Sequence, residues 1–161
     1  MVLQWRTIAP GAGHAAGREL LAQMYRQHTG RDLPPICIAE RGKPYFENDA
    51  LHFSISHTKK HVFCVLSHCP VGIDAEELNR EIDLRLADKI LSLSEKQQFD
   101  TAPDKRLALL KFWVLKEALV KCSGEGLRSY PNQTSFSLDD PRLTQIDGCL
   151  VAVIQEEHYA V

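Results

Sequence analysis

Apolar residues recur every three or four positions in two segments, and this pattern predicts two amphipathic helices. We expect the first helix over Gly17–His28, with Gly30 placed to end it. We expect the second over Leu107–Cys122, with Gly124 and Gly126 at its carboxyl end, where glycine readily adopts a left-handed cap. The apolar seam of this second helix consists of Ala108, Phe112, Leu115, Leu119 and Cys122.

Alternation of apolar and polar residues predicts strands between and after the helices. Over Leu51–Ser56 every second residue is apolar, as in a half-buried strand. The other expected strands are Ile36–Ala39, Val62–Ser67, 71–74, Thr134–Leu138 and Cys149–Gln155, with 158–161 as a possible last strand. The charged stretch Glu76–Phe99 is expected to be rich in helix. Helix followed by strands, twice along the chain, predicts an α+β fold.

Composition narrows the class of protein without identifying a reaction. The 161 residues are 44% hydrophobic, enough for a buried core, and the net charge of −2 gives no general attraction to nucleic acid or membranes. No apolar run approaches the roughly 20 residues that span a bilayer, and the first residues lack a signal-peptide core. We therefore expect a soluble, cytoplasmic protein. The 5 cysteines form no CxxC pair and are expected to be buried hydrophobes rather than zinc ligands.

Two carboxylates follow the short apolar run at residues 71–73. If this segment is extended, Asp74 and Glu76 project from the same face and repel each other, which favours a bound cation. Oxygen ligands of this kind suit Mg²⁺. The alternative is a helix N-terminus, in which Asp74 is the cap and Glu76 and Glu77 complement the helix dipole. Taken alone, the segment favours the helix cap.

The second predicted helix carries a polar stripe opposite its seam. Trp113, Glu117 and Lys121 lie at i, i+4 and i+8, with Lys116 beside them. A solvated Glu117–Lys121 ion pair explains part of the stripe and contributes only about 0.3–0.5 kcal/mol. Tryptophan is a poor residue for a merely solvated face, so the stripe favours a binding site. Glu117 offers a metal ligand, and the lysines offer charge to neutralise phosphate.

Two shorter motifs precede these residues. In FSISHT, a predicted strand ends in Ser56, His57 and Thr58, and in RGKP, Lys43 and Pro44 occupy a turn. Each motif alone carries little information. The sequence contains no Walker loop, dinucleotide fingerprint or Ser-His-Asp order.

Taken in order, the four motifs resemble those of the 4′-phosphopantetheinyl transferases. The family pattern is GKP, FSxSH, GIDxE and WxxKEAxxK. In this chain the four motifs occupy residues 42–44, 53–57, 72–76 and 113–121. Four motifs in the family's order and at plausible separations are far more specific than any one of them.

The resemblance implies transfer of phosphopantetheine from coenzyme A to a serine of an acyl or peptidyl carrier protein, with release of 3′,5′-ADP. It implies that Asp74, Glu76 and Glu117 hold Mg²⁺ on the pyrophosphate of coenzyme A. Such a reaction depends mainly on positioning and charge neutralisation. Either Glu117 or a metal-bound water is the base that activates the carrier serine.

The resemblance also assigns residues to coenzyme A. Catalytic roles fall to Glu117, Lys121 and His57. Contacts with coenzyme A are expected from Lys43, Pro44, Ser56, His57, Trp113, Lys116 and Lys121. The N-terminal segment is shorter than in the family, and Arg6 and Arg18 are the candidates for its missing basic residues.

The subtype resembled is the longer, surfactin-synthetase-activator-like one. About seventy residues precede Gly72, whereas the short, trimeric type begins almost at that motif. We therefore expect two similar helix-plus-antiparallel-sheet halves, 1–70 and 71–161, packed as an intramolecular pseudo-dimer in a monomer. Two alternatives stay open: a non-catalytic relative that binds coenzyme A or a carrier protein, and an unrelated Mg²⁺-dependent phosphohydrolase.

Overall fold

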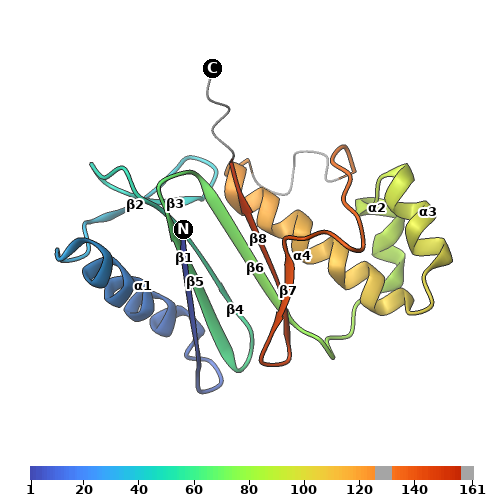
Figure 1. Ribbon diagram of the computed structural model, residues 1–161, viewed down its shortest axis with the longest axis horizontal. Coiled ribbons are helices and arrows are strands. Elements are labelled where there is room, and N and C mark those ends of the chain that lie inside the picture. Colours follow the sequence, from blue (N-terminus) through green and yellow to red (C-terminus); the bar gives the residue numbers. More distant parts are fainter. Residues whose placement is uncertain (126–131, 157–161) are drawn as a thin grey trace.

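The computed structural model describes residues 1–125 and 132–156 as strands and helices that alternate along the chain (Figure 1). The strands are β1 (Val2–Thr7), β2 (Ile36–Ile38), β3 (Pro44–Phe46), β4 (His52–His57), β5 (His61–Ser67), β6 (Val71–Glu77), β7 (Leu143–Ile146) and β8 (Cys149–Gln155). The helices are α1 (Gly13–Thr29), the 3₁₀ turn η1 (Leu84–Leu86), α2 (Ala87–Ile90), α3 (Leu93–Thr101) and α4 (Lys105–Ser123).

Two three-stranded antiparallel sheets have the same topology. The first has the order β1-β5-β4 and the second the order β6-β8-β7. The first strand of each sheet precedes the long helix, α1 or α4, and the other two strands follow that helix. The last of the three in the chain, β5 or β8, lies in the centre of its sheet. The expected α+β fold is confirmed, and the repeated topology agrees with the expected pseudo-dimer. The division of the chain at residue 70 stays a prediction.

Each sheet packs its two faces differently. In β5, Val62, Cys64 and Leu66 pack with α1, whereas Phe63 and Val65 belong to a separate cluster with β6 and β8. Strand alternation explains this division, because successive side chains leave opposite faces. The second sheet repeats the arrangement, since Leu150, Ala152 and Ile154 of β8 pack with α4. In Figure 1 the helices α1 and α4 accordingly lie on either side of the strands.

The helix α4 is longer and more enclosed than its seam predicts. Its N-cap is Asp104, whose carboxylate accepts the Leu107 N–H at 2.9 Å. Gly124 ends it in the left-handed conformation, as expected, and Gly126 lies outside the described residues. Buried residues extend beyond the seam to Leu109, Leu110 and Val114, because η1, α2 and α3 cover the side opposite the sheet.

The predicted strand Thr134–Leu138 is wrong. This segment is irregular, because side chains of α3 replace a neighbouring strand as its hydrogen-bond partners. The Phe136 N–H donates to Glu95 Oε1 at 2.9 Å, and the Leu138 N–H donates to Gln98 Oε1 at 3.1 Å. The strand lies instead at β7, and the possible strand at 158–161 falls outside the described residues.

None of the helices in residues 1–125 and 132–156 combines the length and apolarity that crossing a membrane requires.

At Gly72 the backbones of β6 and α4 lie very close to each other. A Cβ atom there would lie 2.0 Å from the Ala118 carbonyl oxygen and 2.4 Å from the Cys122 nitrogen. Because both are backbone atoms of a packed helix, no side-chain rotation relieves the clash.

We expect Gly72→Ala to destabilise the fold by at least about 2 kcal/mol. Gly17→Ala is the matched control, since its methyl would meet the side chain of Ile55 at 2.8 Å, which can move. Urea unfolding of both variants measures the difference. Equal losses of unfolding free energy would contradict the close approach as the reason for this glycine.

Candidate active site

The carboxylate cluster forms where β6 lies against α4. The segment that contains Asp74 and Glu76 is extended, so the interpretation as a helix cap is wrong. The two carboxylates alternate with Ile73 and Ala75, which belong to the apolar cluster between the sheets. Asp74 and Glu76 therefore lie on the same face of β6 as Gly72, and this face packs against α4.

The polar stripe of α4 lies along this face of β6. Lys121 Nζ donates to Asp74 Oδ1 at 2.7 Å, at one end of the stripe. At the other end the Trp113 indole lies near Glu76 and helps to lower the pKa of that carboxyl, and Glu117 lies one helical turn from both Trp113 and Lys121. The ion pair of Lys121 thus joins the helix to the strand.

Burial and mutual repulsion make these carboxylates unusually basic. Desolvation is the largest cause that raises the pKa of Asp74, which is 6% exposed. It also raises the pKa of Glu117, followed by repulsion from Asp74. The pKa of Glu76 is raised by desolvation and by Asp74, although Arg80 opposes the shift. Burial, more than repulsion between the carboxylates, is therefore the main cause of all three raised pKa values.

Two oxygens of this cluster are suited to a metal ion. Asp74 Oδ2 and Glu117 Oε1 are buried and have no hydrogen-bond partner among the residues that the structure describes. Such orphaned carboxylate oxygens are costly unless a cation binds them. Within residues 1–125 and 132–156, no group of three His, Cys, Asp or Glu side chains is already arranged around a common point. Glu76 is directed to Arg80, with which it forms an ion pair. The two unpartnered oxygens are hard carboxylate donors, which fit a hard divalent cation such as Mg²⁺.

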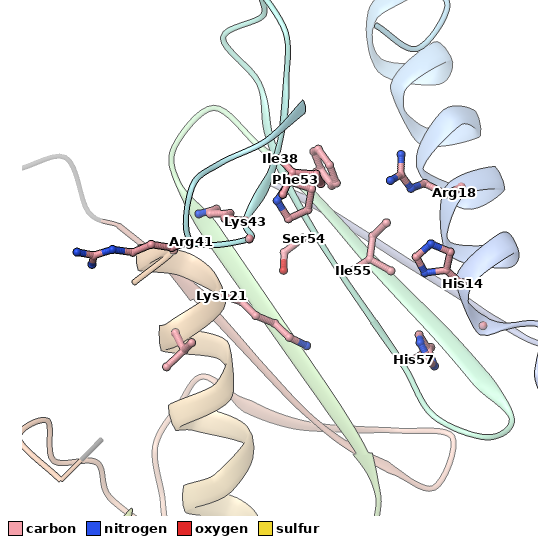
Figure 2. Close-up of a pocket in the computed structure, with 15 residues that line it drawn as sticks. His14, Arg18, Ile38, Arg41, Lys43, Phe53, Ser54, Ile55, His57 and Lys121 are labelled. Atoms are coloured by element: carbon pink, nitrogen blue, oxygen red, sulfur yellow. The ribbon is translucent and has the colours of Figure 1, made fainter. Parts of the chain in front are cut away.

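A cationic pocket of about 470 Å³ adjoins the cluster. It lies between α1, the β2–β3 turn, β4 and the carboxyl end of α4 (Figure 2). Its apolar wall consists of Ile38, Pro44, Phe53 and Ile55, and its basic residues are His14, Arg18, Arg41, Lys43, His57 and Lys121. No carboxylate is among the described residues that line it. The pocket suits a ligand with several negative charges and an apolar or planar part.

Lys43 joins the β2–β3 turn to the end of α4. Its Nζ donates a hydrogen bond to the Cys122 carbonyl, one of the acceptors that a helix leaves free at its C-terminus. Desolvation lowers the pKa of Lys43, which is half-buried. The capping glycine also makes room for this lysine, because a Cβ at Gly124 would lie 3.0 Å from Lys43 Cδ.

His57 lies where the cationic pocket meets a second cavity of about 930 Å³. This cavity is lined by Thr58, Lys59, Glu76, Glu77 and Arg80, among others, and shares Gly13, His14 and His57 with the first. Gly13 lets the imidazole approach α1, since a Cβ there would lie 2.5 Å from His57 Nδ1. The two cavities form one groove that leads from basic residues to carboxylates.

The structure corrects the expected position of Lys116. This lysine is 3% exposed, and its Nζ lies 2.8 Å from Glu95 Oε2 and 2.9 Å from the Thr134 carbonyl oxygen. It points away from the groove because α3 and the segment around Thr134 cover that side of α4. Desolvation accordingly lowers its pKa.

Other residues named from the sequence divide between the groove and its surroundings. Arg18 lines the cationic pocket, whereas Arg6 is bound to the Ala16 carbonyl and to Glu19. Ser56 is buried behind the pocket wall, next to Asp74. Sequence reasoning missed His14 and Arg41 as pocket residues. The position of Arg41 directly before the GKP motif was the available signal.

The raised pKa of Glu117 predicts a pH-dependent stability for the metal-free protein. The folded state binds this proton more tightly than the unfolded chain does. The wild type therefore loses stability as pH rises through the raised pKa, whereas Gln does not titrate. We therefore expect Glu117→Gln to gain melting temperature relative to the wild type as the pH rises from about 4 to 8. Thermal unfolding in the presence of a chelator measures it, and a difference independent of pH would contradict the raised pKa.

Fold and groove together define an α+β protein with a cationic pocket beside a cluster of carboxylates. A family model described as the 4′-phosphopantetheinyl transferase superfamily matches residues 70–158, more than half of the chain. The chain belongs to this superfamily.

Several characterised proteins are similar to this chain. It is 37% identical over 124 residues to the 4′-phosphopantetheinyl transferase Sfp of Bacillus subtilis (strain 168), and this alignment covers 74% of this chain and 51% of Sfp. It is 36% identical over 122 residues to the 4′-phosphopantetheinyl transferase psf-1 of Bacillus pumilus, covering 70% of this chain and 52% of psf-1. A solved structure of the Thermotoga maritima holo-[acyl-carrier-protein] synthase aligns at 26% identity and a TM-score of 0.46, over 53% of this chain and 61% of that one. The chain spans about half the length of the characterised relatives it matches.

Proposed function

We propose that this protein transfers 4′-phosphopantetheine from coenzyme A to a serine of an acyl or peptidyl carrier protein, with release of 3′,5′-ADP. The observation that carries the proposal is the groove itself. A cationic pocket with an apolar wall adjoins a second cavity lined by Glu76, and Lys121 lines the pocket while it binds the buried Asp74. For a member of this superfamily, such a groove suits coenzyme A, which carries a nucleotide at one end and reacts at its pyrophosphate.

The basic residues bind and orient coenzyme A in this proposal. Lys43 and Arg18 lie on opposite walls of the pocket, so they neutralise separate negative charges of one ligand. His57 lies at the junction of the two cavities and Lys121 reaches in from α4 (Figure 2). Ile38 and Phe53 supply apolar surface for a base. Held in this way, the pyrophosphate lies next to the carboxylate cluster.

Asp74, Glu76 and Glu117 would hold Mg²⁺ in this proposal. When bound, the ion supplies charge neutralisation at the pyrophosphate and so stabilises the leaving group. Lys121 places a second positive charge on the same side of the groove. Glu117 has a raised pKa and an oxygen that no group in the described part of the chain hydrogen-bonds, so it is suited to accept a proton from the carrier serine as well as to bind metal. Its negative charge is required in either role.

The direct test is transfer to a carrier protein. The purified protein is incubated with coenzyme A, Mg²⁺ and several apo carrier proteins, and intact masses are recorded with and without a chelator. We expect a carrier protein to gain the mass of phosphopantetheine, with a chelator-sensitive rate and with release of 3′,5′-ADP. Binding of coenzyme A without transfer to any carrier would instead favour a non-catalytic relative. Sedimentation velocity tests the expected monomer, which stays a prediction together with the cytoplasmic location.

A further inference from the structure

The seam between the two halves is closed by serine hydroxyls. Strands β4 and β6 belong to different sheets and lie side by side (Figure 1). The Ile73 N–H donates to Ser54 Oγ at 3.1 Å, and the Ala75 N–H donates to Ser56 Oγ at 3.1 Å. Both serines are buried. Along this edge of β6, two hydroxyls accept the hydrogen bonds that a neighbouring strand's carbonyls would otherwise accept.

Ser56 makes one contact that Ser54 does not. Its Oγ lies 3.3 Å from Asp74 Oδ1. A serine hydroxyl has one proton to donate and two lone pairs. Because Ser56 Oγ accepts from the Ala75 N–H, its own proton is available to Asp74. Ser54 lines the cationic pocket instead.

These contacts assign different tasks to the two oxygens of Asp74. Oδ1 accepts from Ser56 and from Lys121 Nζ, the latter at 2.7 Å. Oδ2 is buried, and no atom of residues 1–125 or 132–156 hydrogen-bonds to it. Two donors from different elements, β4 and α4, therefore fix the plane of the carboxylate and leave one oxygen for another ligand. A carboxylate held by a single donor rotates more freely.

We propose that Ser56 is a positioning residue that holds Asp74 in the orientation required for binding a divalent cation, through a hydroxyl that the Ala75 N–H fixes in turn. The inference rests on the metal site of the proposed function. It replaces the expected direct contact of Ser56 with coenzyme A. It also makes the proposed metal site depend on contact between the two halves, because Ser56 of the first sheet orients Asp74 of the second.

Metal affinity without coenzyme A is the measurement that separates positioning from packing. Ser56→Ala, Ser56→Thr and the matched control Ser54→Ala are titrated with Mn²⁺, and free Mn²⁺ is read by electron paramagnetic resonance. Both alanine variants leave one buried N–H unpaired, so we expect both to lower the melting temperature by several degrees. Only Ser56→Ala should weaken Mn²⁺ binding, by about 10- to 100-fold. Ser56→Thr keeps the hydroxyl and should bind as the wild type does.

Three results would overturn the inference: Ser56→Ala with wild-type Mn²⁺ affinity, equal weakening in Ser54→Ala, or no Mn²⁺ binding by the wild type. If Ser56→Ala does not fold, Ser56→Cys replaces it, because a thiol is a weaker donor and should also weaken Mn²⁺ binding. The proposed transfer is judged separately. If Mn²⁺ affinity follows Ser56 but no carrier protein is loaded, the inference stands and the proposed function fails.

Discussion

Glu117→Gln should lower the rate of carrier-protein loading by about 100-fold or more, the typical loss for a positioned acid–base or electrostatic group. Glutamine keeps the size of the side chain and the helix propensity of α4, so the change removes little except the charge. The position faces β6 and lies off the buried seam of α4. Single-turnover loading at saturating coenzyme A measures the rate, and thermal unfolding confirms that the variant is folded.

A matched control uses another carboxylate near the groove. Glu81 lines the second cavity but belongs to none of the contacts around Asp74. Glu81→Gln should therefore load carrier protein within a few-fold of the wild-type rate. Wild-type loading by Glu117→Gln, or unfolding of that variant, would show that Glu117 serves only the structure of the helix.

Glu95→Ala should destabilise the fold by about 3–5 kcal/mol, the cost of leaving a buried charge without its partner. Glu95 is 0% exposed and forms an ion pair with Lys116 at 2.8 Å. The same carboxylate accepts the N–H groups of Ser92 at 2.8 Å and Phe136 at 2.9 Å, so it holds α3, α4 and the following segment together. Its removal leaves an ammonium group and two N–H groups buried without this acceptor.

A double variant separates the charge from the packing. Glu95→Gln combined with Lys116→Met removes both charges and keeps similar volume, so it should recover much of the loss measured for Glu95→Ala. Urea unfolding of the single and double variants gives the unfolding free energies. If Glu95→Ala costs less than about 1 kcal/mol, the remaining partners of Lys116, among them the Thr134 carbonyl oxygen, are enough to hold its charge. In that event the buried pair is not what holds α3 against α4.

The sequence by itself determined the elements whose hydrogen bonds close locally. The helical spacing of Leu20, Leu21, Met24 and Tyr25 predicted α1, and Gly30 ends it in the left-handed conformation. The same reasoning predicted the start of α4 to within two residues, and it predicted that Gly124 ends the helix. Both predictions succeed because a helix bonds within its own segment, so apolar spacing and a terminal glycine suffice.

Some strands were harder to predict, because a strand bonds to a distant segment. Thr134–Leu138 has a strand-like composition, yet Glu95 and Gln98 of α3 take its N–H groups. The hairpin of β7 and β8 did have a local signal, since Asp147 and Gly148 both have positive φ and form the Asp-Gly turn typical of hairpins.

The order of the motifs predicted the family and the residues of the carboxylate cluster, but only the tertiary structure decided how the site is built. Residues 71–77 are compatible with a strand or a helix cap when taken alone, and pairing with β8 decides for the strand. Helical periodicity places Lys116 and Lys121 near the same stripe, whereas packing directs one to Glu95 and the other to Asp74. These partners lie far along the chain. A charged side chain is directed by whichever partner the packed fold brings within hydrogen-bond distance, and local spacing does not encode that choice.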